Sequence, residues 1–415
     1  MKRLLFIAHR VPYPPDKGER VRALEQIKAL SPYYRLTVAA FAHGAGDCDS
    51  AAALRQWAEK VVTVPAGGWG GMIRGAVSML AGRSVGEGVF RAKNLLDLLR
   101  EESRQEPFDL VVASSSTTLP VVLGVPAGAR VMDLVDVDSA KWYQYAANST
   151  WPMRWVYRRE AEGIRRLERL AIKRCDAVVV ISSAEAAELG PAADNVVIAG
   201  NGVDGEYFKP APNLASAAPS IVFTGTMSYR PNAEGVCWFV REVWPELRKQ
   251  SPQLTFVIVG RDPTRSVLRL ARIDGVEVIG AVPDVRPYLA AASLAVAPLH
   301  MARGVQNKIL EAMAAGRAVV ASPEALAGLE VAQGSEVLSA RMPREWQDRI
   351  RFLLADPAAR SRIEQAARAR VVRDYVWSAR LAPLVALCRR LAPSQDATPP
   401  VSRAEGTKQG KLPIA

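Results

Sequence analysis

Cysteine and histidine are scarce in this chain of 415 residues, which contains four cysteines and three histidines. The cysteines are scattered, and their spacing matches neither a zinc site nor a redox pair. This pattern excludes a disulfide-rich secreted scaffold and suits a reducing compartment, so we expect a cytoplasmic protein without a bound metal. The four cysteines are Cys48, Cys175, Cys237 and Cys388.

Long hydrophobic runs are also missing, since no stretch approaches the roughly 20 apolar residues that cross a bilayer. The first ten residues imitate a signal peptide, but their apolar core is short and runs into His9 and Arg10 without a small-residue cleavage site. We therefore expect residues 4–8 to form a buried strand. No Gly-x-Gly-x-x-Gly follows this strand, which argues against a nicotinamide dehydrogenase.

Positive charge is in excess, with 54 lysines and arginines against 42 acidic residues and a net charge of +12. A balance of this kind fits nucleic acid, an anionic membrane surface or a polyanionic substrate. Residues 154–174 are strongly basic and follow Trp151, so they predict either a solvated helix or a helix on a membrane surface. Residues 69–82 are apolar and flexible, and fit either a membrane-surface segment or a buried packing helix.

Short apolar runs alternate with helical patterns along the whole chain. Such an alternation predicts parallel sheets that are covered by helices on both faces, and the length suggests two domains of about 200 residues each. In the first half the expected strands are residues 4–8, 36–41, 60–64, 110–113, 130–135, 177–181 and 196–199. In the second half they are residues 221–224, 255–259, 276–279, 294–297 and 318–321.

The helices expected in the first half are residues 19–30, 51–59, 90–102 and 154–173. The break between the halves is expected near Asn201-Gly202-Val203-Asp204 and the following Pro-, Ala- and Asn-rich segment. We accordingly predict a first domain at 1–205, a second at 206–375, a helix at 376–392 that packs back toward the first domain, and a disordered tail at 393–415. Ligands of doubly wound α/β domains bind at the carboxyl ends of the strands.

The most informative stretch is residues 303–316, which places an amide, an ammonium and a carboxylate on the first turns of a helix after a buried strand. Phosphates favour a helix N-terminus and a cation, and a carboxylate accepts hydrogen bonds from ribose hydroxyls. Lys308 and Glu311 are three residues apart and share one helix face. Gly316 is expected to end the helix. The alternative is an ordinary alanine-rich helix on which Lys308 and Glu311 form a solvated pair.

Several further motifs occur in a consistent order. They are Pro15-Asp16-Lys17-Gly18-Glu19-Arg20, Ile181-Ser182-Ser183, Asn201-Gly202-Val203-Asp204, Phe223-Thr224-Gly225-Thr226-Met227, Val259-Gly260-Arg261, Gly280-Ala281-Val282-Pro283-Asp284 and Tyr375-Val376-Trp377-Ser378. Together with residues 310–316 they resemble the family 4 retaining glycosyltransferases of GT-B fold, up to about Leu391. Residues 8–22 and 133–142 further resemble a sugar transferase subgroup that accompanies exosortase and PEP-CTERM loci of bacterial exopolysaccharide synthesis.

This resemblance implies two Rossmann-like domains, with acceptor binding in the first, nucleotide-sugar binding in the second, and a cleft between them. It implies transfer of a sugar, with retention, from a nucleotide diphosphate sugar to a saccharide or lipid-linked acceptor in cell-surface glycan synthesis. No metal is expected to take part. The implied location is the cytoplasm, peripherally on the inner membrane, with no role for nucleic acid.

The resemblance also assigns residues to the donor site. Lys308 and Arg230 are expected to stabilise the leaving diphosphate, and Asp136 to orient the acceptor or the donor sugar. The full set expected to bind the donor is Gly225, Thr226, Arg261, Val282, Arg303, Gly304, Asn307, Lys308 and Glu311. Arg303 stands where the family usually has a glutamate, so it is expected to meet a phosphate or an acidic sugar instead.

On the acceptor side we expect His9, Lys17, Gly18 and Arg20. Gly18 allows the backbone to approach a ligand, while Lys17 and Arg20 either meet an anionic acceptor or only add surface charge. His9 is either an acceptor-side base or a solvated loop histidine. Asp136 and Asp138 form an Asp-x-Asp pattern that binds a divalent cation in the GT-A fold, but that interpretation leaves the second half unexplained.

Two other functions stay open at this point. A GT-B relative that acts as a nucleotide-sugar epimerase or hydrolase needs a further carboxylate in the cleft, and Arg303 argues against it. A basic nucleic-acid-binding protein needs a recognised binding module, which the basic segment lacks. The sequence thus favours a glycosyltransferase of α/β GT-B fold.

Overall fold

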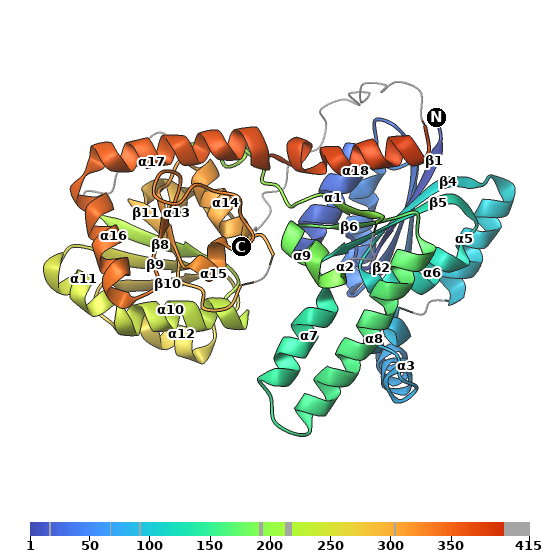
Figure 1. The fold of residues 1–415 in the computed structure, drawn as a ribbon, viewed down its shortest axis with the longest axis horizontal. Coiled ribbons are helices and arrows are strands. Elements are labelled where there is room, and N and C mark those ends of the chain that lie inside the picture. The colour runs from blue at the N-terminus through green and yellow to red at the C-terminus, as the bar shows by residue number, and fades with distance from the viewer. Residues whose placement is uncertain are drawn as a thin grey trace. The chain divides into compact units, whose positions relative to one another are not determined.

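The computed structural model describes residues 1–15, 18–66, 68–90, 93–190, 194–211, 218–302 and 304–393. The chain divides into two compact units, which are drawn in Figure 1. The first unit consists of residues 1–200 together with the C-terminal segment that begins at Leu381. The second unit is Asn201–Arg380. Arg303 and Lys17 lie outside the described residues, as does most of the expected tail.

The first unit is built on a seven-stranded parallel sheet with the order β3-β2-β1-β4-β5-β6-β7. β1 and β6 are buried along their whole length, because helices cover both faces of the sheet. The strands are β1 (Arg3–Ala8), β2 (Arg35–Ala42), β3 (Lys60–Pro65), β4 (Phe108–Ser114), β5 (Ala127–Val135), β6 (Ala177–Val180) and β7 (Val196–Ile198).

The helices of the first unit connect these strands, and the α7–α8 pair forms a hairpin that extends from the sheet (Figure 1). Turns of 3₁₀ helix at Ala52–Gln56 and Ser116–Thr118 add to them. The helices are α1 (Gly18–Leu30), α2 (Ala45–Ala51), α3 (Gly68–Leu80), α4 (Val85–Val89), α5 (Lys93–Gln105), α6 (Leu119–Gly124), α7 (Asp138–Ala147), α8 (Met153–Arg174) and α9 (Ser183–Leu189).

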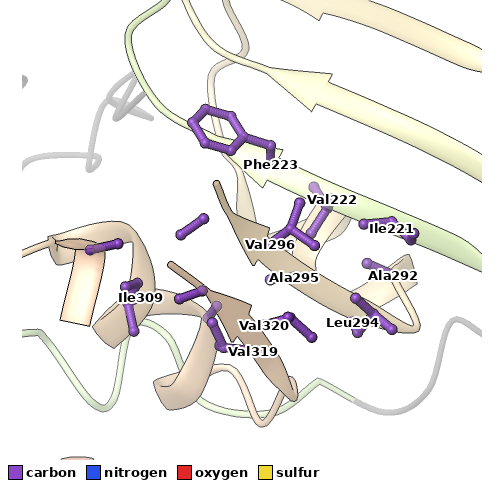
Figure 2. Close-up of a cluster of buried hydrophobic side chains, with 14 of the residues drawn as sticks. Ile221, Val222, Phe223, Ala292, Leu294, Ala295, Val296, Ile309, Val319 and Val320 are labelled. Carbon is purple, nitrogen blue, oxygen red and sulfur yellow. The ribbon is translucent and has the colours of Figure 1, made fainter. Parts of the chain in front are cut away.

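The second unit is built on a six-stranded parallel sheet with the order β10-β9-β8-β11-β12-β13. Its core includes Val222 of β8, Val296 of β11 and Val319 of β12, together with Ile309 of α14 (Asn307–Ala314) (Figure 2). The strands are β8 (Ser220–Thr224), β9 (Thr255–Val259), β10 (Val276–Gly280), β11 (Leu294–Ala297), β12 (Val319–Ala321) and β13 (Leu338–Ser339).

Helices of the second unit follow the same alternating plan, and a π-helical turn at Val371–Tyr375 precedes the last helix. The helices are α10 (Arg230–Glu242), α11 (Trp244–Gln250), α12 (Arg265–Leu270), α13 (Arg286–Ala291), α14 (Asn307–Ala314), α15 (Pro323–Leu326), α16 (Pro343–Ala355), α17 (Pro357–Arg370) and α18 (Trp377–Leu391). No helix in the described part of the chain is long and apolar enough to cross a membrane.

Most of α18 belongs to the first unit, because that unit takes in the chain from Leu381. The Tyr34 hydroxyl donates a hydrogen bond to the Ala392 carbonyl at 3.1 Å, and the Arg389 guanidinium lies 5.0 Å from the centre of the Tyr33 ring. Leu384 and Cys388 are fully buried. The last helix therefore completes the core of the unit that holds the N-terminus.

One expected helix is wrong in extent. The chain is helical from Ala45 to Ala51 and then forms the 3₁₀ turn Ala52–Gln56, instead of a single helix over 51–59. Glu59 already pairs with β2, since its amide donates to the Leu36 carbonyl at 2.9 Å. The helical run therefore ends before this residue.

Candidate functional site

Lys308 and Glu311 lie on the first turns of α14, as the sequence predicts. The Lys308 ammonium donates a hydrogen bond to Asn232 Oδ1 at 2.7 Å and lies 5.3 Å from the centre of the Phe223 ring. Gly316 has a φ of +69° just after the helix, which is the conformation expected of a C′ glycine. The alternative of a solvated Lys308–Glu311 pair is wrong, because the ammonium points to a buried amide.

Burial dominates the electrostatics of this helix face. It lowers the pKa of Lys308 from 10.5 to about 8, although the nearby Glu311 acts in the opposite direction. It raises the pKa of Glu311 from 4.5 to about 7, with Lys308 again opposing the shift. Both charged forms are therefore costly in the free protein, and a ligand that brings phosphates and hydroxyls would stabilise them.

Glycine backbone forms the carboxyl ends of three neighbouring strands in this sheet. The Gly225 amide donates to the Val259 carbonyl at 3.0 Å, and the Gly260 amide donates to the Gly280 carbonyl at 2.9 Å. A Cβ on Gly260 would lie 1.7 Å from the Gly225 oxygen, so only glycine fits there. The edge beside Lys308 is consequently backbone-lined, as a site for close approach of a ligand requires.

Asn232 joins the two halves of this site and was not predicted from the sequence. It lies on α10, is 3% exposed, and its Nδ2 donates to the Thr226 carbonyl at 2.9 Å while its Oδ1 accepts from Lys308. The structure therefore brings Gly225, Thr226 and Lys308 together. An asparagine after a proline gives no signal of this role in a single sequence.

The other predicted donor residues differ in their burial and hydrogen bonding. Asn307 begins α14, and its Oδ1 is buried with no hydrogen-bond partner among the described residues. Gly304 has a φ of +62°, and a Cβ on Gly328 would lie 2.2 Å from its oxygen. Asn307 is thus ready to accept a hydrogen bond from a ligand.

Three of the predicted donor residues have less direct positions. Val282 is 7% exposed and packs in the core. Arg261 is half-buried beside Gly260, and its backbone carbonyl accepts from the Met227 amide at 2.8 Å. Arg230 begins α10 and is exposed, and its Nε donates to Glu234 at 2.7 Å. The role of Arg230 in holding a diphosphate stays a prediction.

In the first unit, Asp136 follows β5 directly after a strained residue. Val135 has a φ of +67°, which is rare for a β-branched side chain and typical of functional sites. Asp136 Oδ1 is buried and has no hydrogen-bond partner among the residues that the structure describes. Burial, followed by the negative charges of Glu185 and Asp138, raises the pKa of Asp136 from 3.8 to about 7.

His9 follows β1, two strands away from β5 in the sheet. Its Nδ1 is buried and unpartnered within the described ranges, and its carbonyl oxygen lies 3.1 Å from His43 Nε2. Burial lowers the pKa of His9 from 6.5 to about 4, so the ring is neutral at physiological pH. A neutral imidazole at this position can donate a hydrogen bond to a hydroxyl or accept one from it, but it is a weak base.

Strand β4 lies between β1 and β5 in the sheet. It ends in a run of hydroxyl residues that was not predicted as part of the site. Ser115 has a φ of +75°, and Ser116 Oγ is buried with no partner in the described part of the chain. The sequence signal was available, because residues 114–118 are Ser-Ser-Ser-Thr-Thr directly after an apolar strand. Glu185 was also missed; it accepts a hydrogen bond from the Val137 amide at 2.6 Å.

Gly18 and Arg20 lie at the start of α1. No described atom comes within 4 Å of the place where a Cβ on Gly18 would lie, so the backbone there is open. Arg20 pairs with Asp47 at 3.1 Å and is 9% exposed. Asp138 of the Asp-x-Asp pattern lies 3.7 Å from Lys141. Among the described residues no three metal-ligating side chains gather into a site.

The comparisons with known proteins concern the family of one segment and the fold of the chain. Residues 218–356 match the family model described as Glycosyl transferases group 1. Sucrose-phosphate synthase from Thermosynechococcus elongatus has a similar structure, with a TM-score of 0.67 and 19% identity over 94% of this chain and 99% of that chain. No curated protein sequence matches the chain significantly.

Two further solved structures are similar over nearly the whole chain. Anabaena HepE in complex with UDP and glucose has a TM-score of 0.65 and 19% identity, and covers 94% of this chain and 99% of its own. WaaG, a glycosyltransferase involved in lipopolysaccharide biosynthesis, has a TM-score of 0.64 and 14% identity over 94% of this chain and 100% of its own. The whole chain therefore has the GT-B fold, and with the group 1 domain at residues 218–356 it is a glycosyltransferase.

Proposed function

We propose that this glycosyltransferase moves a sugar, with retention of configuration, from a nucleotide diphosphate sugar to a saccharide or lipid-linked acceptor. The observation that carries the proposal is the buried Lys308 ammonium held at the glycine-lined edge of the second sheet. Solved structures of HepE, which share the fold, are complexes with UDP and with UDP-glucose. They support a nucleoside diphosphate as the leaving group.

The chemistry follows from charge. As the glycosidic bond to the diphosphate breaks, negative charge grows on the phosphate oxygens, and Lys308 with the N-terminus of α14 stabilises it. Glu311, once ionised, accepts hydrogen bonds from the ribose. In same-face attack the leaving phosphate takes the proton of the acceptor hydroxyl, so a separate strong base is not required. Asp136 and His9 then orient sugar hydroxyls rather than remove a proton.

We further propose that the acceptor is linked to lipid and is met at the cytoplasmic face of an anionic membrane, in exopolysaccharide synthesis of the exosortase-associated kind. Four large apolar residues of α3 are 60–74% exposed, and Trp151 at the tip of the α7–α8 hairpin is 82% exposed. Arg154 and Arg158 follow on α8, so apolar and basic groups occur together. The α3 residues are Met72, Ile73, Val77 and Leu80.

Calorimetric titration with UDP, GDP and their sugars, with and without magnesium, tests the donor assignment. We expect micromolar binding of one nucleotide without metal, and a large loss of affinity in Lys308→Ala. Lys249→Ala, which removes an exposed lysine of α11, is the matched control and should bind like the wild type. Absence of binding, or binding only with magnesium, would overturn the proposal.

A further inference from the structure

Asn232 makes two hydrogen bonds in opposite directions, one as an acceptor and one as a donor. Its Oδ1 accepts from Lys308 Nζ at 2.7 Å, and its Nδ2 donates to the Thr226 carbonyl at 2.9 Å. A carboxylate cannot donate the second bond, and an aliphatic side chain makes neither. The amide therefore ties α14 to the turn that follows β8, across 76 residues of sequence.

The neighbouring glycine shows that the position of this amide is tightly constrained. A Cβ on Gly225 would lie 2.8 Å from Asn232 Nδ2 and 3.1 Å from Lys308 Cε. Asn232 is 3% exposed, so water does not compete for its two hydrogen bonds. Gly225, Asn232 and Lys308 therefore pack closely against one another.

Two neutral groups and one acidic group surround the Lys308 ammonium. Asn232 from α10 and the Phe223 ring from β8 are neutral, and Glu311 on α14 is the acidic group that acts on Lys308. A neutral acceptor fixes the direction of the ammonium without cancelling its charge. An acidic residue in its place would bind Lys308 more strongly but would compete with a ligand phosphate.

We propose that Asn232 is a positioning residue, which holds the Lys308 ammonium toward the donor diphosphate and leaves its positive charge free for the phosphates. This inference rests on the proposed nucleotide-sugar donor. It differs from a purely structural role, in which any substitution at 232 would weaken folding and the binding of every ligand equally. The two roles are separable because the two substitutions change different properties. Asp keeps the shape of the amide and adds a negative charge, whereas Leu adds no charge and removes both hydrogen bonds.

The test compares Asn232→Asp, Asn232→Leu and wild type in their affinity for the nucleoside diphosphate that the wild type binds, and for the matching nucleoside. We expect Asn232→Asp to weaken diphosphate binding about tenfold or more, the size of one hydrogen bond to a charged group. Nucleoside binding should change little, because the nucleoside carries no phosphate. Asn148→Asp, an exposed amide at the end of α7, is the control for an added negative charge.

A double-mutant cycle keeps the test valid if a variant is less stable. In a Lys308→Ala background, the neutral Asn232→Leu should cost little further diphosphate affinity, because the ammonium that Asn232 positions is gone. Asn232→Asp should also move the alkaline limit of diphosphate binding to higher pH, since a carboxylate raises the pKa of Lys308. Equal losses for nucleoside and diphosphate, or additive effects in the cycle, would overturn the inference.

The outcomes also separate this inference from the proposed function. If the wild type binds no nucleoside diphosphate, the donor site itself is wrong. If the wild type binds one and Asn232→Asp binds it equally well, the donor site stands and the positioning role of Asn232 is wrong.

Discussion

The carboxyl edges of the two sheets are prepared for ligands in opposite ways. In the second unit Lys308 and the Thr226 carbonyl already have Asn232 as their partner, and among the central polar groups only Asn307 Oδ1 is buried without a partner in the described part of the chain. In the first unit His9 Nδ1, Ser116 Oγ and Asp136 Oδ1 are buried without partners among the described residues. Each unsatisfied buried polar atom destabilises the folded protein by about 1–3 kcal/mol. A hydroxyl-rich ligand that hydrogen-bonds to these atoms would remove this destabilisation.

The comparison indicates that the two edges recognise different kinds of ligand. A nucleotide donor always presents the same diphosphate, which a preassembled cation can meet without rearrangement. An acceptor presents a pattern of hydroxyls, which unpaired donors and acceptors recognise one by one. Substitutions at each edge, together with the pH dependence of donor binding, test this difference.

Replacing Lys308 by alanine should have the largest effect, because it removes the ammonium that meets the leaving group. We expect the rate of transfer to fall by about 100-fold or more, the range found for the loss of one preorganised electrostatic contact. Affinity for the nucleoside diphosphate should fall with it, whereas acceptor KM should be unchanged. Steady-state kinetics with both substrates measure this, and an unchanged rate would remove Lys308 from the mechanism.

Asp136→Asn should act on the other edge and leave donor affinity intact. We expect kcat to fall by about 10- to 100-fold through lost orientation of the reacting sugar. The folded protein should become more stable at pH 8, because the raised pKa of Asp136 means that ionising it disfavours the fold. This cost is absent below the unfolded pKa and grows until pH rises past about 7.

A gain in Tm of about 2–4 °C at pH 8, and none at pH 4, is therefore expected for Asp136→Asn. Differential scanning calorimetry at the two values checks it. A loss of stability at both would mean that the carboxylate is a structural cap of β5 instead of a ligand-orienting group.

Donor binding should have a narrow pH optimum between the two shifted groups of α14. Affinity should decline above pH 8 as Lys308 loses its proton, and below pH 7 as Glu311 gains one, by up to about tenfold per pH unit. A nucleotide sugar is the better probe, because its phosphates do not titrate there. Lys308→Met should abolish the alkaline limb and keep the acidic one; persistence of both limbs would assign them to other groups.

Ser116→Ala should give the smallest effect. It removes a buried hydroxyl that has no protein partner, so stability should hold or rise slightly. We expect acceptor KM to increase about tenfold at most, with donor KM unchanged. Thr118→Ser is a control on the same turn, since its hydroxyl already bonds to the Ser115 carbonyl at 2.9 Å. An unchanged acceptor KM in Ser116→Ala would contradict recognition by unpaired groups.

Much of the fold could be predicted from the sequence, because buried parallel strands are continuous apolar runs. The expected strands correspond to β1–β12 within a few residues, while β13 has two residues and gives no such run. Lys308, Glu311 and Gly316 were also predictable, since helix spacing and capping act over a few residues. The role of Asn232 was not, because its partner lies 76 residues away and nothing local indicates it.

The chain leaves the first unit at Gly200 and returns to it at Leu381, so that unit is the first to be synthesised and the last to be finished. Until α18 emerges from the ribosome, Tyr34 lacks its carbonyl partner and the surface that covers Leu384 and Cys388 faces water. A fragment that ends at Gly200 would carry the whole seven-stranded sheet but not its closing helix. Exposed apolar surface of this kind invites aggregation, so the two units are better dissected by supplying α18 as a separate peptide.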